Sequence, residues 1–217
     1  MVNNPAITIN ANPGDKINII GVVLDGTALA NTSGIAFNSG GSLHVQDSVI
    51  RNFGQYGISF TPNASSQLFV SNTLLSDNGT DGVSISPSGS GTITGVLNHV
   101  MIENSGTDGV GIGSSAQTIN VTISDSASVN NADGIFTSVI GGSISVMVRN
   151  STIANNSGVG LFSGGSGSTI RVTRSTITGN ATAWTQGASG VVSSYADNNI
   201  DGNGAANSEP PGPLTHH

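Results

Sequence analysis

The stretch Val49-Ile50-Arg51-Asn52-Phe53-Gly54-Gln55-Tyr56-Gly57-Ile58 returns along the chain as a short phrase. An apolar residue leads to Asn, a few small residues follow, and Gly with Ile, Val or Leu closes the phrase. Its echoes lie at residues 75–83, 102–110, 129–135, 153–161, 177–184 and 200–203. The closing glycines are Gly34, Gly57, Gly82, Gly109, Gly134 and Gly160. Their steps are 23, 25, 27, 25 and 26 residues, so the chain is a repeat with a period of about 25 residues.

Each repeat carries short alternating apolar triplets, such as Leu43-x-Val45, Leu68-x-Val70 and Val121-x-Ile123. Alternation over three to five residues is typical of half-buried strands, and no stretch has the period of a helix. Each repeat therefore predicts three short strands separated by turns. Stacking such coils at strand spacing gives an all-β fold, a parallel β-solenoid of about seven to eight coils.

Three columns of apolar residues are expected to face the interior. The first is Ile35, Ile58, Val83, Val110, Ile135, Leu161 and Trp184. The second is Leu24, Ile50, Leu75, Ile102, Val129, Ile153, Ile177 and Ile200. The third is Val45, Val70, Leu97, Ile123, Val148 and Val172. A stack of buried amides is expected from Asn52, Asn78, Asn104, Asn131, Asn156, Asn180 and Asn203, because each amide can bond to the next coil.

The phrases at residues 130–135, 151–156 and 172–180 look like the repeat of right-handed parallel β-helices in the pectate-lyase-like superfamily. The chain resembles bacterial proteins of that kind with no assigned function, over residues 16–204. The resemblance implies a right-handed, single-stranded parallel β-helix. It leaves the activity open, because this fold carries lyases, hydrolases, epimerases, adhesins and scaffolds. We expect residues 1–204 to form the β-helix domain and 205–217 to form a Pro-rich tail, with His216 and His217 as a tag remnant.

Charge and composition exclude several classes of function. The chain has 12 Asp and Glu, five Lys and Arg and a net charge of −7, which argues against nucleic acid as a partner. It has no Cys, and no apolar run is long enough to span a bilayer, so membrane insertion is not expected. Residues 1–5 do not resemble a signal peptide. A secreted or cell-surface location is favoured, with any leader absent from this sequence.

Three aspartates, Asp81, Asp108 and Asp133, each precede the glycine of their coil. Neighbours in this column would lie about 5 Å apart, so their repulsion could be relieved by a cation such as Ca²⁺. The alternative is that each Asp caps its own turn. No other cofactor is expected.

Two further sets are candidates for ligand binding. Arg149, Arg171 and Arg174 are expected on one outward face of adjacent coils, where they could bind an acidic sugar or a carboxylate. Phe136 and Phe162 are expected to point outward, one above the other, where they could face a sugar ring. The alternatives are solubility and local ion pairs for the arginines, and packing beneath a loop for the phenylalanines.

No residue is assigned a catalytic role. Asp77 and Glu103 could form a glycosidase pair, and His99 could act as a base beside Asp125 in its outward column. The acids and bases nevertheless fall in separate places. The sequence therefore favours a non-catalytic scaffold or carbohydrate-contacting module, with polysaccharide as the partner. A polysaccharide-acting lyase or hydrolase, or the rod fragment of one, is the alternative.

A self-associating rod is the second alternative. Ile7, Ile9, Ile17 and Ile19 belong to the first coil, which lacks a capping helix. An uncapped coil exposes unpaired strand edges, so association through this N-terminal face is expected.

Overall fold

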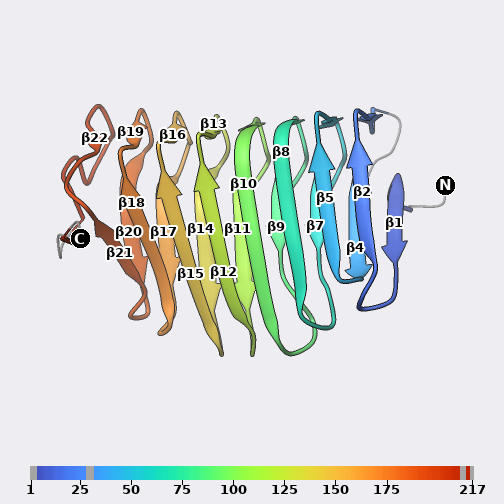
Figure 1. The fold of residues 1–217 in the computed structure, drawn as a ribbon. Helices are drawn as coiled ribbons and strands as arrows, with labels where there is room; N and C mark the ends of the chain where they lie inside the picture. Colours follow the sequence, from blue (N-terminus) through green and yellow to red (C-terminus); the bar gives the residue numbers. More distant parts are fainter. Residues whose placement is uncertain (1–3, 28–31, 211–213, 216–217) are drawn as a thin grey trace.

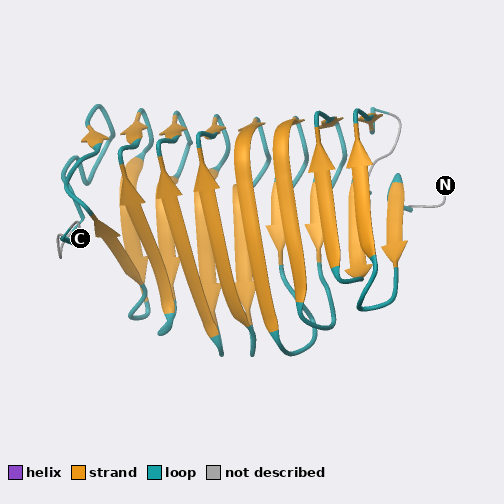
Figure 2. Cartoon of the chain, viewed as in Figure 1, coloured by secondary structure: helices purple, strands orange, loops and turns teal. Residues whose placement is uncertain are grey.

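The computed structural model describes residues 4–27, 32–210 and 214–215, and these wind into a rod of stacked coils (Figure 1). The rod is built of strands joined by loops, and the described residues contain no helix (Figure 2). Within this part of the chain there is accordingly no helix that could cross a membrane.

One parallel sheet takes a single strand from each of eight coils, and we call it the first sheet. In spatial order its strands are β1 (Ile7–Asn10), β4 (Ile35–Ser39), β7 (Ile58–Phe60), β9 (Val83–Ile85), β11 (Asp108–Ser114), β14 (Asp133–Val139), β17 (Val159–Gly164) and β20 (Thr182–Gly187).

The second sheet is also parallel and has fourteen strands in two limbs. The broad limb contains β2 (Lys16–Ile20), β5 (Ser42–Gln46), β12 (Thr118–Ser124), β15 (Ser143–Arg149), β18 (Ser168–Thr173) and β21 (Val191–Ser194). The short limb contains β3 (Val23–Asp25), β6 (Val49–Arg51), β13 (Ala127–Val129), β16 (Thr152–Ala154), β19 (Thr176–Thr178) and β22 (Asn199–Ile200). The two long strands β8 (Ser66–Ser76) and β10 (Thr92–Glu103) run through both limbs. The prediction of three strands per coil is confirmed.

A single residue in the left-handed conformation turns the chain from the broad limb into the short limb. These corner residues are Asp47, Asn72, His99, Asp125, Asn150 and Arg174, with φ between 46° and 54°. Asn, Asp and His adopt this conformation more readily than most residues, which explains their recurrence. The predicted outward column that contains His99 and Asp125 is therefore the corner of the rod.

The first and third predicted core columns are confirmed, apart from Trp184 in the last coil, which is half-buried. In the second column Leu24 and Ile200 are half-buried, because each lies in an end coil. Val129 is a wrong assignment in that column. Strand register pairs Ile102 with Ser128 and Ser128 with Ile153, so Ser128 points inward and Val129 is half-buried. The Ser128 hydroxyl donates to the Gly134 carbonyl at 2.8 Å.

The closing glycines are required by close packing between coils. A Cβ on Gly57 would lie 2.6 Å from the Gly82 carbonyl oxygen, and a Cβ on Gly134 would lie 2.5 Å from that of Gly160. Any side chain here would push successive coils apart.

Buried amides stack over one half of the rod. The Nδ2 atoms of Asn131, Asn156 and Asn180 donate to Oδ1 of the next asparagine at 3.2, 2.8 and 2.9 Å, and Nδ2 of Asn203 donates in turn to Oδ1 of Asn207 at 2.9 Å. Asn52 and Asn104 were wrongly placed in this column. Both have a positive φ and form the turn one residue before the buried position of the column. Phe53 and Ser105 occupy that buried position.

The two ends of the rod differ. Among the described residues at the N-terminal end, β1, β2 and β3 each pair with one neighbour, and Ile20 and Val23 are 60 % and 67 % exposed. At the other end Ala205 and Leu214 lie against the last coil: the Ala183 amide donates to the Ala205 carbonyl, and the Leu214 amide donates to the Ser194 carbonyl. The proposed tag residues His216 and His217 lie outside the described residues.

Candidate functional site

The structure brings two of the predicted arginines together at the C-terminal part of the broad limb. Arg149 ends β15, and Arg174 is the corner residue that follows β18. Both are exposed. They line an open groove of about 570 Å³, which we call the arginine groove; its lining is Met147, Arg149, Thr173, Arg174, Tyr195, Asp197 and Thr215.

Arg171 lies beside this groove and not in its lining. Its position in β18 is in register with Met147, and its guanidinium donates to the Ser145 hydroxyl at 2.9 Å. The guanidinium groups of Arg149 and Arg174 make no hydrogen bond to another described residue. They therefore have donors available for a ligand.

Two aspartates, Asp197 and Asp125, reduce the positive charge at the groove. Asp197 accepts hydrogen bonds from the Thr173 hydroxyl at 2.7 Å and the Arg174 amide at 3.0 Å. Asp125 lies at the corner next to Asn150, and a hydrogen bond from Asn150 lowers the pKa of its carboxyl, with smaller contributions from His99 and Arg149. An anionic ligand would meet two free guanidinium groups on a partly neutralised rim.

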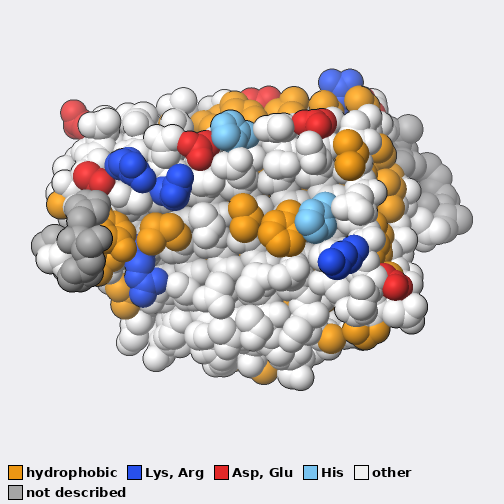
Figure 3. Space-filling model, in the orientation of Figure 1, with side chains coloured by type: hydrophobic (Ala, Val, Ile, Leu, Met, Phe, Trp, Pro, Cys, Tyr) orange, Lys and Arg blue, Asp and Glu red, His pale blue; other side chains and the backbone are white. Residues whose placement is uncertain are grey.

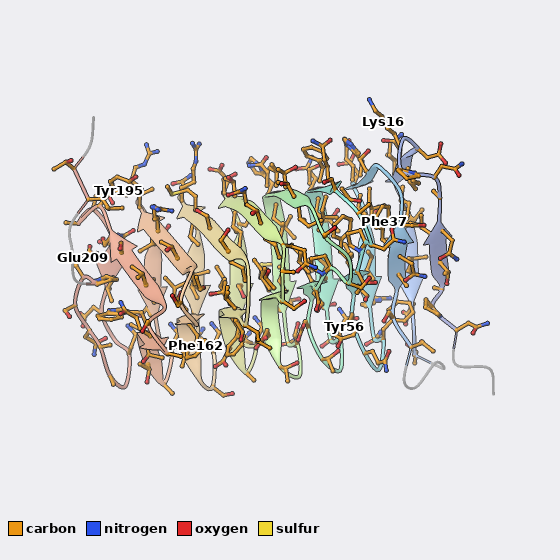
Figure 4. The ribbon with its side chains drawn as sticks, turned by 90° about the horizontal axis from the view of Figure 1, so that it is seen from below. Lys16, Phe37, Tyr56, Phe162, Tyr195 and Glu209 are labelled. Atoms are coloured by element: carbon orange, nitrogen blue, oxygen red, sulfur yellow. The ribbon has the colours of Figure 1, made fainter. Side chains whose placement is uncertain are left out.

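Phe136 and Phe162 lie on the opposite side of the rod, in β14 and β17 of the first sheet. Their rings stack with centroids 4.5 Å apart and an interplanar angle of 10°, and both are half-buried. Figure 4 shows Phe162 on one side of the rod and Tyr195, which lines the arginine groove, on the other. The two sets of predicted ligand-binding residues are therefore not one site.

The predicted aspartate column forms beside Phe136. Asp108 is in register with Asp133, and the Asp81 carboxylate accepts from the Thr107 hydroxyl at 2.8 Å and the Asp108 amide at 3.3 Å. Gly111 leaves space for these groups: a Cβ there would lie 2.7 Å from Asp81 Oδ2 and 3.0 Å from Asp108 Oδ2. Asp133 instead accepts from the Val159 amide at 2.6 Å.

The environment of the Asp108 carboxyl group was not predicted from the sequence. The carboxylate accepts no hydrogen bond from another described residue, and burial, followed by repulsion from Asp81 and Asp133, raises its pKa to about 7. Phe136 follows Gly111 in the outward register of the sheet, so an apolar ring stands next to this notch. The Phe136 ring in the adjacent coil was the feature of the sequence that could have indicated the apolar environment of Asp108.

The aspartates do not assemble into a metal-binding cluster in this structure. Among the described residues, no three His, Asp or Glu side chains are arranged to hold an ion. The Ca²⁺ site therefore gains no support from the geometry.

The other candidate residues lie at turns or strand ends: His99 is a corner residue, Asp77 follows β8 and Glu103 ends β10. Asp77 accepts a hydrogen bond from the exposed Asn104 side chain at 3.1 Å. Nδ1 of His99 lies 2.7 Å from Oδ1 of Asn98, whose amide nitrogen lies 3.2 Å from Asp125 Oδ2. His99 thus reaches Asp125 through Asn98 and not directly.

Comparison with known families agrees with this architecture. A family model described as "Right handed beta helix region" matches residues 9–205, nearly the whole chain. The chain belongs to this family. The right-handed sense of the β-helix follows from the match. No curated protein and no solved structure is significantly similar to the chain.

Proposed function

We propose that this right-handed β-helix is a non-catalytic carbohydrate-contacting module, and that its arginine groove binds the carboxylate of an acidic sugar. The observation that carries the proposal is the pair of unbonded guanidinium groups, Arg149 and Arg174, on one open groove. Guanidinium groups pair with carboxylates through parallel hydrogen bonds, and Met147 and Tyr195 supply apolar surface for a sugar ring.

Isothermal titration calorimetry with trigalacturonate tests this proposal. The double variant Arg149→Gln/Arg174→Gln should weaken binding by about tenfold or more, since each tenfold corresponds to about 1.4 kcal/mol. Arg51→Gln is the matched control: it removes one charge from the short limb, where Arg51 pairs with Asp25 at 3.0 Å. Binding that the double variant leaves unchanged would contradict the proposal, as would equal binding of a neutral trisaccharide.

A second candidate function is glycoside hydrolysis at the aspartate column. Asp108, whose pKa is raised to about 7, could hold a proton beside the carboxyl group of Asp81, and glycosidases use a pair of closely spaced carboxyl groups. Release of reducing ends from polygalacturonate, lost in Asp108→Asn, would favour this function. No release at any pH between 4 and 8 would remove it.

A further inference from the structure

A line of apolar side chains runs along the outer face of the short limb. Strand register aligns one outward position from coil to coil, next to the buried residues Ile50, Leu75 and Ile102. The aligned residues are Val23, Val49, Leu74, Met101 and Ala127, and we call them the short-limb stripe. Val23 and Met101 are 67 % and 37 % exposed, and the other three are half-buried. An exposed apolar line across five coils is typical of a surface that binds a partner.

Acidic side chains flank this stripe on both sides. Two residues before the stripe, at the corner, lie Asp47 and Asp125; two residues after it lie Asp25 and Glu103, and Asp77 follows at the next turn. These are five of the 12 Asp and Glu of the chain. The described strands of the short limb contain one Lys or Arg, Arg51, which pairs with Asp25 at 3.0 Å. Figure 3 shows hydrophobic side chains at the upper edge of the rod, where Figure 1 places the short strands, with acidic side chains beside them.

Most of these carboxylates keep their charge without a cationic partner. The Asp47 carboxylate accepts from the neutral Asn72 side chain at 3.2 Å, and the Glu103 carboxylate accepts no hydrogen bond from another described residue. A hydrogen bond from Thr27 lowers the pKa of Asp25, and one from Asn150 lowers the pKa of Asp125. The flanks of the stripe are therefore negatively charged at neutral pH.

A groove lies along the middle of the stripe. Its volume is about 480 Å³, and its lining includes Met101 and Ala127 of the stripe and His99, Asp125 and Asn150 of the corner. Apolar surface and a carboxylate thus line the same groove. A ligand that fits it has an apolar side and a basic side.

We propose that the short-limb stripe binds a basic amphipathic α-helix of a partner protein, which lies along the rod with its apolar face on the stripe and its Lys or Arg side chains toward the flanking acids. From Val23 to Ala127 the stripe crosses four strand steps, about 19 Å at about 4.8 Å per step, and a helix of about 13 residues has this length. Apolar residues recur about every 5.4 Å along one helix face, but about every 6.8 Å along one face of an extended strand. The coil spacing therefore favours a helix, and charge complementarity favours a basic one.

A second copy of this chain is the competing occupant of the stripe, because apolar surfaces of this kind also pair in dimers. The described residues contain no helix, and the chain has five Lys and Arg against 12 Asp and Glu. A second copy therefore offers the acidic flanks little complementary charge. Its binding is an outcome of the test.

Fluorescence anisotropy of a labelled synthetic peptide tests the proposal. The probe has about 18 residues, with Leu at the positions of one helix face and Lys elsewhere. A scrambled peptide of the same composition and an analogue with Glu in place of Lys are the peptide controls. We expect the probe to bind the parent protein about tenfold more tightly than the scrambled peptide, and its affinity to fall as salt concentration rises.

One pair of variants tests the apolar contact. Met101→Ser removes apolar surface from the middle of the stripe and should weaken probe binding about tenfold. Val49→Thr is the second variant if Met101→Ser does not fold. Val191→Ser is the matched control, because Val191 is similarly exposed, at 41 %, and lies in β21 of the broad limb. It should bind the probe as the parent does.

A second pair of variants tests the charges at constant net charge. Asp47→Asn/Glu103→Gln removes one carboxylate from each side of the stripe and should also weaken probe binding about tenfold. Asp15→Asn/Asp201→Asn is the matched control, since both residues are exposed and neither flanks the stripe. It should leave the affinity unchanged.

The other outcomes overturn the inference. Equal binding of the scrambled or acidic peptide, or a stripe variant that binds the probe as tightly as its control does, would show unspecific attraction. Absence of probe binding up to about 100 μM would also contradict a helix site. A parent dimer that Met101→Ser converts to a monomer in sedimentation would assign the stripe to a second copy. Trigalacturonate binding at the arginine groove should be the same in all these variants, so the two proposals fail separately.

Discussion

The role of an asparagine in this chain depends on its exact position in the coil, and a difference of one residue changes that role. Asn104 has a φ of 56° and forms the turn that follows β10, with its side chain exposed, whereas Asn131 is buried and joins the amide stack. Asn131 Oδ1 accepts from the Ser105 amide at 2.9 Å, and its Nδ2 donates to Ser128 and Asn156. Removing Asn131 leaves several buried partners unpaired.

We therefore expect Asn131→Ala to lower the free energy of unfolding by about 1–3 kcal/mol, the cost of unpaired buried groups. Urea denaturation measures the change. Asn104→Gly is the control, because glycine keeps the left-handed backbone, and it should cost less than about 0.5 kcal/mol. Equal losses in the two variants would show that the amide stack contributes nothing to stability.

Asp108 should make the stability of the protein depend on pH. Its pKa is raised to about 7 in the folded state, so folding favours the protonated carboxyl. Stability is then greatest below the usual carboxyl pKa of about 4 and declines as pH rises from about 4 to about 7. Asp108→Asn should flatten this decline and raise the melting temperature at pH 8.

Thermal melts at pH 5 and pH 8 check the expectation. Asp201→Asn is the comparison, since Asp201 is exposed and lies near the C-terminal end of the rod. An unchanged pH slope in Asp108→Asn would mean that the Asp81–Asp108–Asp133 column does not hold the proton in the folded state.

At this scale the sequence predicted the residue types better than their exact positions. At residues 130–131 and 155–156 two asparagines follow each other: the first has a positive φ and forms the turn, and the second joins the amide stack. In a coil with a single Asn, the sequence alone does not decide which of these two positions it occupies. The same shift placed Val129 inside in place of Ser128. A shift of one residue reverses which face a strand side chain occupies, and only the register between coils decides it.

At the scale of the elements, the strands at the two ends are unlike. β1, β2 and β3 leave one edge without a strand partner among the described residues, whereas Ala205, Ser208, Glu209 and Leu214 make hydrogen bonds to the last coil. Unpaired edges with exposed apolar side chains favour pairing with another chain. We infer that two copies associate through their N-terminal coils.

The test replaces exposed residues, because Ile9 is buried and a charge there would disturb the fold itself. In Ile20→Lys/Val23→Lys, light scattering should give the monomer mass at every concentration, while the parent should gain mass as concentration rises. Ile140→Lys is the control, since Ile140 is 92 % exposed and far from this edge. A parent that stays monomeric throughout would contradict self-association.

The presence of strands in each coil was predictable because the apolar triplets and the glycine period repeat along the chain. The outward column His44, Phe69, Val96, Thr122, Met147 and Arg171 of the broad limb was not predictable in the same way. Its members are His, Phe, Val, Thr, Met and Arg, which share no letter or chemical class. Only the pairing of strands places them in one line, and loops of unequal length shift the count between coils.

For the whole molecule, the rod separates its charges by face. Most cations lie on the broad limb, where Glu103 ends the long strand β10, and the first sheet contains Asp108 and Asp133, with Asp81 just before β9, beside the stacked pair of Phe136 and Phe162. The fold keeps the two faces on opposite sides of the core. The arginine groove and the aspartate column therefore lie on different faces of the rod.

The most direct measurement is a titration of the isotope-labelled protein with hexagalacturonate, followed by the chemical shifts of the backbone amides. Our account predicts that the shifts concentrate on Arg149, Arg174 and their neighbours in β15 and β18. Shifts confined to β9, β11 and β14 around Asp81 and Asp108, or no shifts at all, would contradict it.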